Sequence, residues 1–424
     1  MRVLFLALIF ACPLPAAAAE LTRVASSFDP DRPFGMYLDL GFERTATKEK
    51  IVHLSHQSGG LQDVNELWYQ MTDSRLKIDA HIGLWQDLEF HFGLPIVFAQ
   101  DRSWGFTSDS NPTTSTITNN CLQANGQLLD PACPTSLAGA QAMFQVPASS
   151  NRGGLGDMTF GLAYALFNTK RDDTKPMWVI GMDYTAPTAS LLDPTVPTSS
   201  SNRGNIGEKL HKYQFYTALS RRTGAIDPYF KIHYTLPFAG PGWYSNCDHP
   251  SALNMGAPEN CNSSAWSRAD TGIKPSHTGG VIFGAELNAF EDAAKHQKVA
   301  IDIRGIATYI SEGRYYNEMS DLFGKLLYSQ EYMQFGGQIG LVAQPADFIA
   351  LKLNASLIYN TDHMLTYENI GKDLNGDGTV DVSDPAQHLE LNPNFDWRTD
   401  MTGRGFRATD SLTFVLNATA SFHF

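Results

Sequence analysis

Apolar and polar residues alternate with a period of two over many segments of the chain. In the last stretch, SLTFVLNATASFHF, every second residue from Leu412 to Phe424 is apolar, and most of the residues between them are polar. An earlier stretch, GMYLDLGFER, repeats the pattern with apolar residues from Met36 to Phe42. Because successive side chains of a β-strand point to opposite faces, the alternation predicts strands with one apolar and one polar face.

This pattern predicts twelve strands, each ten residues or longer, which is enough to cross a bilayer at a tilt. The expected strands lie at 35–44, 75–85, 88–98, 157–167, 177–186, 210–220, 227–236, 278–290, 299–310, 332–343, 348–359 and 411–424. Short turns alternate without exception with long loops at 45–65, 100–156, 187–209, 237–277, 311–331 and 360–410. An even strand number with short turns at one end and long loops at the other predicts an all-β fold, a transmembrane antiparallel up-and-down β-barrel with long extracellular loops.

Two further sequence features resemble known membrane barrels. The closing strand, which ends on Phe424, resembles the last strand of bacterial outer-membrane barrels. The stretches RLKIDAHIGLWQDLEFHFGLPIVF and RGGLGDMTFGLAYALFN resemble the phenol-degradation (MetA-pathway) outer-membrane channels of aromatic-degradation clusters, distant relatives of the fatty-acid transporters. The matching motifs are Gly93-Leu94-Pro95 at the end of a hairpin and Gly154-Leu155-Gly156-Asp157 at the start of a strand. The resemblance implies an outer-membrane channel of a Gram-negative bacterium.

The first residues of the chain predict secretion. MRVLFLALIFACPLPAAAAE has one basic residue, an apolar stretch and a small-residue cleavage site, so 1–19 is expected to be a signal peptide. A lipoprotein signal ending before Cys12 is the weaker alternative, because Phe10 and Pro13 flank that site. Residues 20–34 are then expected to be a short periplasmic segment, too brief for the N-terminal hatch of the fatty-acid transporters. The barrel would occupy 35–424.

Charge excludes one class of partner. The chain has a formal net charge of −13 at pH 7, which argues against a nucleic-acid partner because phosphate binding requires clustered Lys and Arg. The polar strand faces are expected to line the lumen with Asp39, Glu43, Lys77, Asp79, His81, Glu89, His91, Asp183, Lys231, His233, Glu286, Asp302, Arg304 and Lys352. Because both signs are mixed, ion pairs that brace the wall are favoured over a dedicated path for a charged solute.

The cysteines predict loop disulfides. Four of them lie beyond the signal segment, as two local pairs within polar loops: Cys121 with Cys133, and Cys247 with Cys261. A secreted protein enters an oxidising compartment, so two disulfides are expected, with free thiols as the alternative. Metal binding by these residues is less favoured, since a C-x₂-C unit is absent.

The stretch KDLNGDGTVDVSDPAQ predicts a calcium loop. Asp373, Asn375, Asp377, Thr379, Asp381 and Asp384 occupy positions 1, 3, 5, 7, 9 and 12 of an EF-hand-type loop, with Gly378 at the sharp turn. The aspartate at position 12, where an EF-hand has Glu, resembles the calcium loops of dockerin modules. We expect one structural Ca²⁺ in an extracellular loop, with a metal-free polar turn as the alternative.

One short motif raises the question of catalysis. HLSHQSGG, which contains His56 and Ser58, resembles the H-x-S-N-G element of outer-membrane phospholipase A, where the serine is the nucleophile and the histidine its base. Gly59 replaces the asparagine, and the stretch is expected in a polar loop rather than on a strand facing lipid. An enzyme is therefore not predicted, and a lipid hydrolase remains a minor alternative.

The leading functional prediction is a porin-like channel for passive passage of a small, hydrophobic solute. Its expected partners are outer-membrane lipid and the solute. The alternative from a different class is a non-conducting scaffold for a cell-surface or polysaccharide-export assembly, with cell-surface proteins as partners and a filled lumen.

Overall fold

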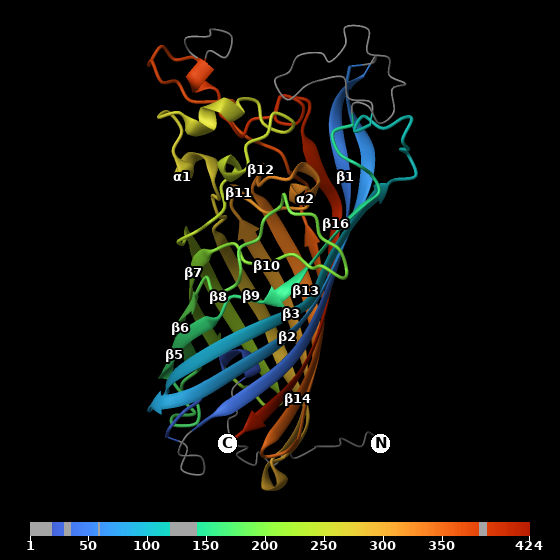
Figure 1. Ribbon diagram of the computed structural model, residues 1–424. Coiled ribbons are helices and arrows are strands. Elements are labelled where there is room, and N and C mark those ends of the chain that lie inside the picture. The colour runs from blue at the N-terminus through green and yellow to red at the C-terminus, as the bar shows by residue number, and fades with distance from the viewer. Residues whose placement is uncertain (1–18, 29–34, 58–59, 119–141, 381–387) are drawn as a thin grey trace, which may run out of the picture.

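The chain forms a closed antiparallel β-barrel (Figure 1). The structure, a computed structural model, describes residues 19–28, 35–57, 60–118, 142–380 and 388–424. The barrel strands are β1 (Tyr37–Gln57), β2 (Gly60–Trp85), β3 (Leu88–Phe106), β5 (Thr159–Phe167), β6 (Met177–Thr185), β7 (Leu210–Ser220), β8 (Ile226–Ala239), β9 (Thr278–Asp292), β10 (Gln297–Ile310), β13 (Tyr332–Ala346), β14 (Ile349–Asn360) and β16 (Phe406–His423). Pairing of β1 with β16 closes the ring, which confirms the predicted twelve-stranded barrel.

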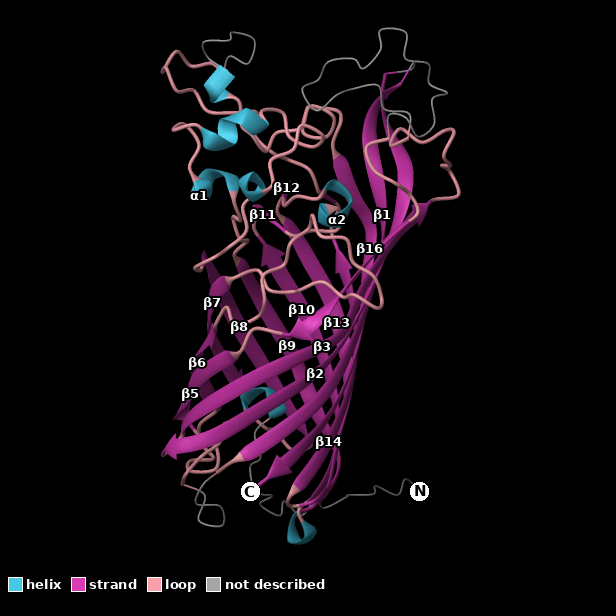
Figure 2. Cartoon of the chain, viewed as in Figure 1, coloured by secondary structure: helices cyan, strands magenta, loops and turns pink. Residues whose placement is uncertain are grey.

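The remaining elements are short. β4 (Ala148–Leu155) pairs with β3, β15 (His363–Met364) pairs with β16, and β11 (Gly313–Tyr315) pairs with β12 (Leu327–Ser329). The helical turns are η1 (Glu20–Thr22), η2 (Asn246–Asp248), η3 (Pro258–Asn262), α1 (Arg268–Thr271), η4 (Ala293–Lys295), α2 (Ser320–Phe323) and η5 (His388–Glu390). Among the described residues, no helix is long and apolar enough to cross a membrane. Figure 2 shows most of the loops and turns gathered at one end, called here the long-loop end. The opposite end, which carries the tight turns between strands, is the short-turn end.

Apolar side chains cover the outside of the barrel. The exposed large hydrophobic residues include Leu40, Phe42, Leu162, Ile180, Phe215, Ile232, Phe283, Ile303, Ile339, Leu353, Phe414 and Leu416. Each belongs to the apolar parity of its strand, and the residues between them point inward. A transmembrane barrel presents such a surface to lipid, because hydrocarbon must meet apolar side chains while the paired strands satisfy the backbone.

A charge on this outer surface should destabilise the barrel in lipid. Ile339, in the middle of β13, is 66% exposed, so Ile339→Lys places an ammonium where the bilayer is most apolar. We expect a loss of about 2–4 kcal/mol in the free energy of unfolding, measured by urea titration in lipid vesicles. Leu61 is the matched control, since it is 51% exposed but lies near the tip of the β1–β2 hairpin. An equal loss for Leu61→Lys would contradict the assignment of the lipid-facing band.

β1, β2 and β3 extend well beyond the predicted strand ends. Residues 45–65, predicted as a loop, are strand except at 58–59, which lie outside the described residues. The loop predicted at 100–156 begins only after Phe106 and contains β4. The physical reason is a reversal of polarity: above the apolar band, Lys48 and Lys50 lie on the outside against Trp68, while the inward positions become apolar. A strand prediction that requires apolar residues on the outward face therefore ends these strands where the outward residues become polar, which is too early.

The inward apolar residues form a hydrophobic core inside the long-loop end. This loop core consists of Ile51, Leu67, Tyr69, Trp104, Ile117, Phe144, Met319, Phe323, Leu327, Leu365, Phe406 and Ala408. Met319 and Phe323 enter this core from the single helical turn α2. α2 packs into the mouth of the barrel, and Phe323 contacts Phe406 of β16 with ring centroids 6.0 Å apart.

Candidate functional site: the barrel lumen

The N-terminal segment, residues 19–28, lies inside the short-turn end of the barrel, where Figure 1 shows it as a blue turn. The sequence predicts only a short periplasmic tail here, so its position in the lumen is a correction. The segment contacts strands on all sides of the barrel through Glu89 of β3, Ser220 of β7, Glu286 of β9, Lys352 of β14 and Ser421 of β16. It therefore crosses the lumen and narrows it.

Polar contacts hold most of this segment. The carboxylate of Glu20 pairs with Lys352 at 2.7 Å, and the backbone N–H of Glu20 donates to Glu286 Oε1 at 2.5 Å. Arg23 stacks over the ring of Tyr37 at 3.9 Å and lies 3.8 Å from Asp39. The aliphatic side chain of Val24 packs against a cluster formed by β5 and β6 (Ala163, Ala165, Met177 and Val179). Water can replace ion pairs and hydrogen bonds of this kind more readily than a large apolar contact.

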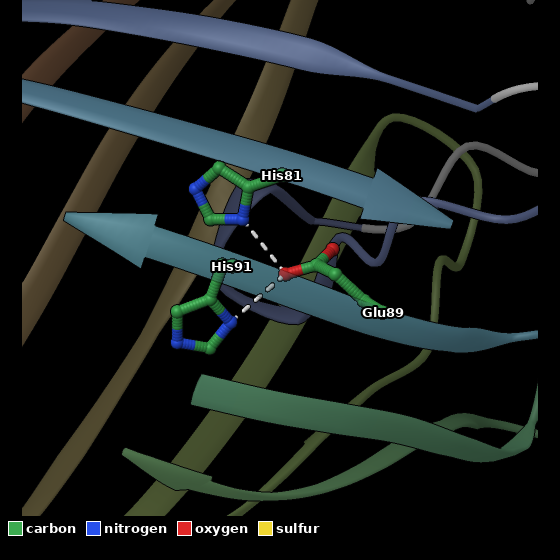
Figure 3. A group of neighbouring side chains, drawn as sticks. All are labelled: His81, Glu89 and His91. Carbon is green, nitrogen blue, oxygen red and sulfur yellow. Dashed lines mark hydrogen bonds and ion pairs between the residues drawn. The ribbon is translucent and has the colours of Figure 1, made fainter. Parts of the chain in front are cut away.

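Above the N-terminal segment, two histidines and a glutamate meet on the wall (Figure 3). His81 of β2 and His91 of β3 are directly opposite in register, and Glu89 precedes His91 by two residues on the same face. Glu89 Oε1 lies 2.7 Å from His81 Nδ1 and 3.3 Å from His91 Nδ1. On its other side, His91 Nε2 lies 2.7 Å from Asp183 Oδ1 of β6. The sequence places all four residues in the lumen but does not predict this cluster.

The other predicted lumen charges mostly meet a partner of opposite sign. Lys77 pairs with Glu43 at 2.6 Å, and Arg304 pairs with Asp302. Lys352 approaches Asp39 at 3.7 Å, and Lys231 lies 4.1 Å from the ring centre of Tyr216. The sequence missed several partners, including Glu20, Arg23, Arg75, Tyr229 and Lys298. Lys298 and Arg75 carry the expected strand parity and could have been found, whereas Glu20 and Arg23 precede the first strand.

The middle of the lumen is accessible to water. The side chain of Lys77, about two thirds of the way along β2, is 37% exposed although it points inward. Among the described residues, the buried atom His233 Nδ1, midway along β8, lacks a hydrogen-bond partner from the protein. Because buried polar groups are nearly always satisfied, water is the expected partner of this atom. The lumen is therefore a wet space between two narrowed ends.

The long-loop end is narrowed by a loop that folds inward. This inward loop, residues 311–331, contains β11, α2 and β12, and Arg152 of β4 holds it in place. The Arg152 side chain is 1% exposed and pairs with Asp321 at 2.5 Å. Its Nε also donates to the hydroxyl of Tyr316 at 2.7 Å, and burial raises the pKa of Tyr316 to about 12. Tyr316 therefore stays neutral, and its hydroxyl donates a hydrogen bond to the carboxylate of Asp321.

The predicted calcium loop is described only in part. Asp373 accepts the backbone N–H groups of Gly376 at 2.6 Å and Gly378 at 2.8 Å, and both glycines have positive φ, as a sharp turn requires. Asp377 Oδ1 accepts the backbone N–H of Thr379 at 2.8 Å, and Asn375 Oδ1 accepts that of Asp377 at 2.9 Å. The last two predicted ligands, Asp381 and Asp384, lie outside the described residues. The first four positions therefore form a compact turn rich in carboxylate oxygens.

The remaining sequence predictions concern the cysteine pairs, the possible catalytic motif and the signal peptide. Cys247 and Cys261 form the predicted disulfide, with Cα atoms 5.3 Å apart, while Cys121 and Cys133 lie outside the described residues. The stretch containing His56 belongs to β1, which corrects its predicted placement in a loop. Ser58, the candidate nucleophile beside it, lies outside the described residues, as do residues 1–18 of the predicted signal peptide 1–19.

The two motifs that carry the family resemblance contact each other. The backbone N–H of Gly156 donates to the carbonyl of Pro95 at 2.8 Å, where the chain passes from β4 to β5. A Cβ at Gly156 would approach the Pro95 ring to 2.8 Å, so the close approach requires glycine. The two motifs are thus in direct contact in the barrel wall.

The described residues therefore define a twelve-stranded barrel that is apolar outside, polar inside and narrowed at both ends. The chain matches no protein-family model and no curated protein sequence. Among solved structures, an outer-membrane channel from Pseudomonas putida F1 is 12% identical, with a TM-score of 0.42 and coverage of 91% of this chain and 95% of that one. A FadL homologue from Pseudomonas aeruginosa is 8% identical, with a TM-score of 0.37 and coverage of 92% and 90%.

The toluene transporter TodX of P. putida is also similar in structure. It is 11% identical, with a TM-score of 0.32 and coverage of 94% of this chain and 91% of that one. Likeness of this degree does not assign a solute.

Proposed function

We propose that the protein is a porin-like channel for passive passage of a small, hydrophobic solute across the outer membrane of a Gram-negative bacterium. The outward apolar band supports the membrane location. The observation that carries the channel function is the water-accessible lumen, represented by the inward but 37% exposed side chain of Lys77. An uncharged solute is favoured because the lumen charges are paired with opposite charges and offer no dedicated path of one sign for an ion.

Reconstitution tests this proposal. Purified full-length protein in planar bilayers is expected to give discrete conductance steps, and proteoliposomes should take up small apolar solutes faster than charged ones of the same size. Uptake that discriminates by size alone would count against a hydrophobic path. An absence of conductance and uptake, also after removal of the N-terminal segment, would reject the channel.

The second candidate is a non-conducting scaffold. One observation favours it: both ends of the lumen are narrowed, by the N-terminal segment and by the inward loop. A scaffold would show no flux and would copurify with cell-surface proteins. The two candidates differ in their use of the water-accessible lumen around Lys77, which a channel requires and a scaffold does not.

We also propose that the loop beginning at Asp373 binds one structural Ca²⁺ through Asp373, Asn375, Asp377, Thr379, Asp381 and Asp384. Carboxylate oxygens at alternate positions around glycine turns are the ligands that this hard cation prefers. The base of the loop is closed by backbone hydrogen bonds between Lys372 and Glu390 and between Ile370 and Asn392, both at 2.9 Å. The metal would order the residues between these bonds.

Calcium removal should therefore expose this loop to proteases. With EGTA present, we expect faster cleavage within 360–410, because metal binding and local folding are coupled. Added Ca²⁺ should restore protection in the wild type but not in an Asp373→Asn, Asp377→Asn double variant. Cleavage within 237–277, where the Cys247–Cys261 disulfide lies, is the internal control and should stay constant. Equal cleavage of 360–410 with and without EGTA would exclude the calcium site.

A further inference from the structure

We propose that His81, Glu89 and His91 form a binding site for a divalent transition-metal ion, with zinc as the best fit, on the lumen wall. One ligand atom from each residue, His81 Nδ1, Glu89 Oε1 and His91 Nδ1, lies within 4.8 Å of the others. In Figure 3, both imidazole rings direct a nitrogen toward the same carboxylate oxygen. Three atoms so arranged can converge on one ion at ligand distances of about 2.0–2.2 Å after a small adjustment.

The partner of His91 on its other side fixes which nitrogen is free to bind. His91 Nε2 lies 2.7 Å from Asp183 Oδ1, and an ionised carboxylate only accepts hydrogen bonds, so Nε2 carries a proton. In neutral imidazole, Nδ1 then holds a lone pair, which points at the oxygen of Glu89. Nδ1 is buried and makes no hydrogen bond within the described structure. Two facing acceptors need either a second proton on the ring or a metal ion between them, and a metal ion would take lone pairs from both sides.

The carboxylate of Glu89 is oriented in the same manner. Its Oε2 accepts the backbone N–H of Ala25 at 2.5 Å and the hydroxyl of Tyr37 at 3.2 Å, which leaves Oε1 for the cluster. The ring of Tyr37 also stacks on His81, with centroids 4.2 Å apart. Metal-binding histidines and carboxylates typically have such supporting hydrogen bonds, which set the direction of each ligand atom.

The neighbouring strand makes room for this arrangement. Gly161 of β5 faces His91 across the sheet, and a Cβ at this position would overlap both the His91 ring and the Asp183 carboxylate. Glycine is therefore needed beside the cluster for space, not for backbone conformation. The site is built into the rigid wall of β2, β3, β5 and β6, which is how a preorganised metal site is supported.

The ligand set indicates the class of metal. Two imidazoles and one carboxylate suit zinc and similar divalent ions better than Ca²⁺ or Mg²⁺, which favour oxygen ligands. Three protein ligands leave a coordination position open toward the wet lumen, where water could bind. Because Glu89 also holds Ala25 of the N-terminal segment, a bound ion would add a fixed positive charge directly beside that segment.

Zinc binding by the whole, tag-free protein tests this site. Metal-stripped protein in detergent would be titrated with ZnCl₂ against a chromogenic chelator, and with CoCl₂ while visible absorption is recorded. We expect one ion per chain and Co²⁺ bands typical of four- or five-coordinate nitrogen and oxygen ligands. Asp183→Asn should weaken zinc binding by roughly 10–100-fold, since it removes the support of His91.

Three comparisons keep the test decisive. The His81→Ala, His91→Ala double variant should lose stoichiometric binding, while His249→Ala, in a loop away from the cluster, should keep it. Heat-modifiable migration on gels would show that each variant still folds as a barrel. Absence of a stoichiometric ion in the folded wild type, or equal affinity in the double variant, would overturn the proposal. Either result is independent of whether the barrel conducts.

Discussion

A chain without residues 20–28 is expected to conduct several-fold better than the full-length protein. This deletion removes the turn η1 and the contacts that cross the short-turn end, including the Glu20–Lys352 pair. The wall keeps every strand pair, since β1 begins only at Tyr37, so the barrel should still fold. Single-channel recording in planar bilayers measures the change, and solute uptake by liposomes should rise with it.

A substitution variant tests whether conductance is limited by the bulk of the N-terminal segment or by the ion pairs that hold it to the barrel wall. The Glu20→Gln, Arg23→Gln double variant keeps the chain length but removes the ion pairs with Lys352 and Asp39. If the segment moves aside during transport, this variant should show more frequent or longer openings at unchanged maximum conductance. Identical conductance for the deletion and the wild type would mean that the N-terminal segment does not limit flow.

Arg152→Ala should loosen the long-loop end. The buried guanidinium holds Asp321, Tyr316 and the backbone carbonyls of Asp193 and Asn205. Its removal leaves the Asp321 carboxylate buried without its cation, which costs about 3–5 kcal/mol. We expect local release of the inward loop, detected as faster proteolysis within 311–331 and as increased conductance.

Arg203→Ala is the matched control for this prediction. Arg203 lies in the loop that follows β6 and pairs with Asp101 at 2.6 Å, but their side chains are 29% and 44% exposed. Exposed ion pairs contribute about 0–1 kcal/mol, so proteolysis and conductance should change little. A similar effect of both substitutions would show that the loops respond to any loss of charge and that Arg152 is not their specific anchor.

The wall of the barrel was predictable because lipid on one side and polar lumen on the other impose a period of two on each strand. Leu351 and Leu353 face outward with Lys352 between them, and this local alternation is enough to assign β14. The same rule failed above the apolar band, where Ile51 points inward to a core and Lys50 points outward. There the alternation persists with its polarity reversed.

The interior of the site was less predictable. Sequence parity places His81, Glu89 and His91 on one face, but their contact with Asp183 depends on β5 lying between β3 and β6 with a glycine at 161. Residues 19–28 show no period and offer no signal of their place in the lumen. Arg152 belongs to a strand, β4, that carries glycine and polar residues and lacks an apolar face. These features depend on tertiary packing that local patterns do not encode.

The loop core also bears on how the ring stays shut. β1 and β16 come from opposite ends of the chain, and His53 and Phe406 face each other across their joint with rings stacked 4.2 Å apart. Phe406 continues into the loop core, where Phe144 and Phe323 pack against it. Loop residues from the middle of the chain therefore pack, inside the barrel, against the pairing of the first and last strands. The seam is therefore held by the β1–β16 strand pairing along its length and, at the long-loop end, also by the packing of the folded loops.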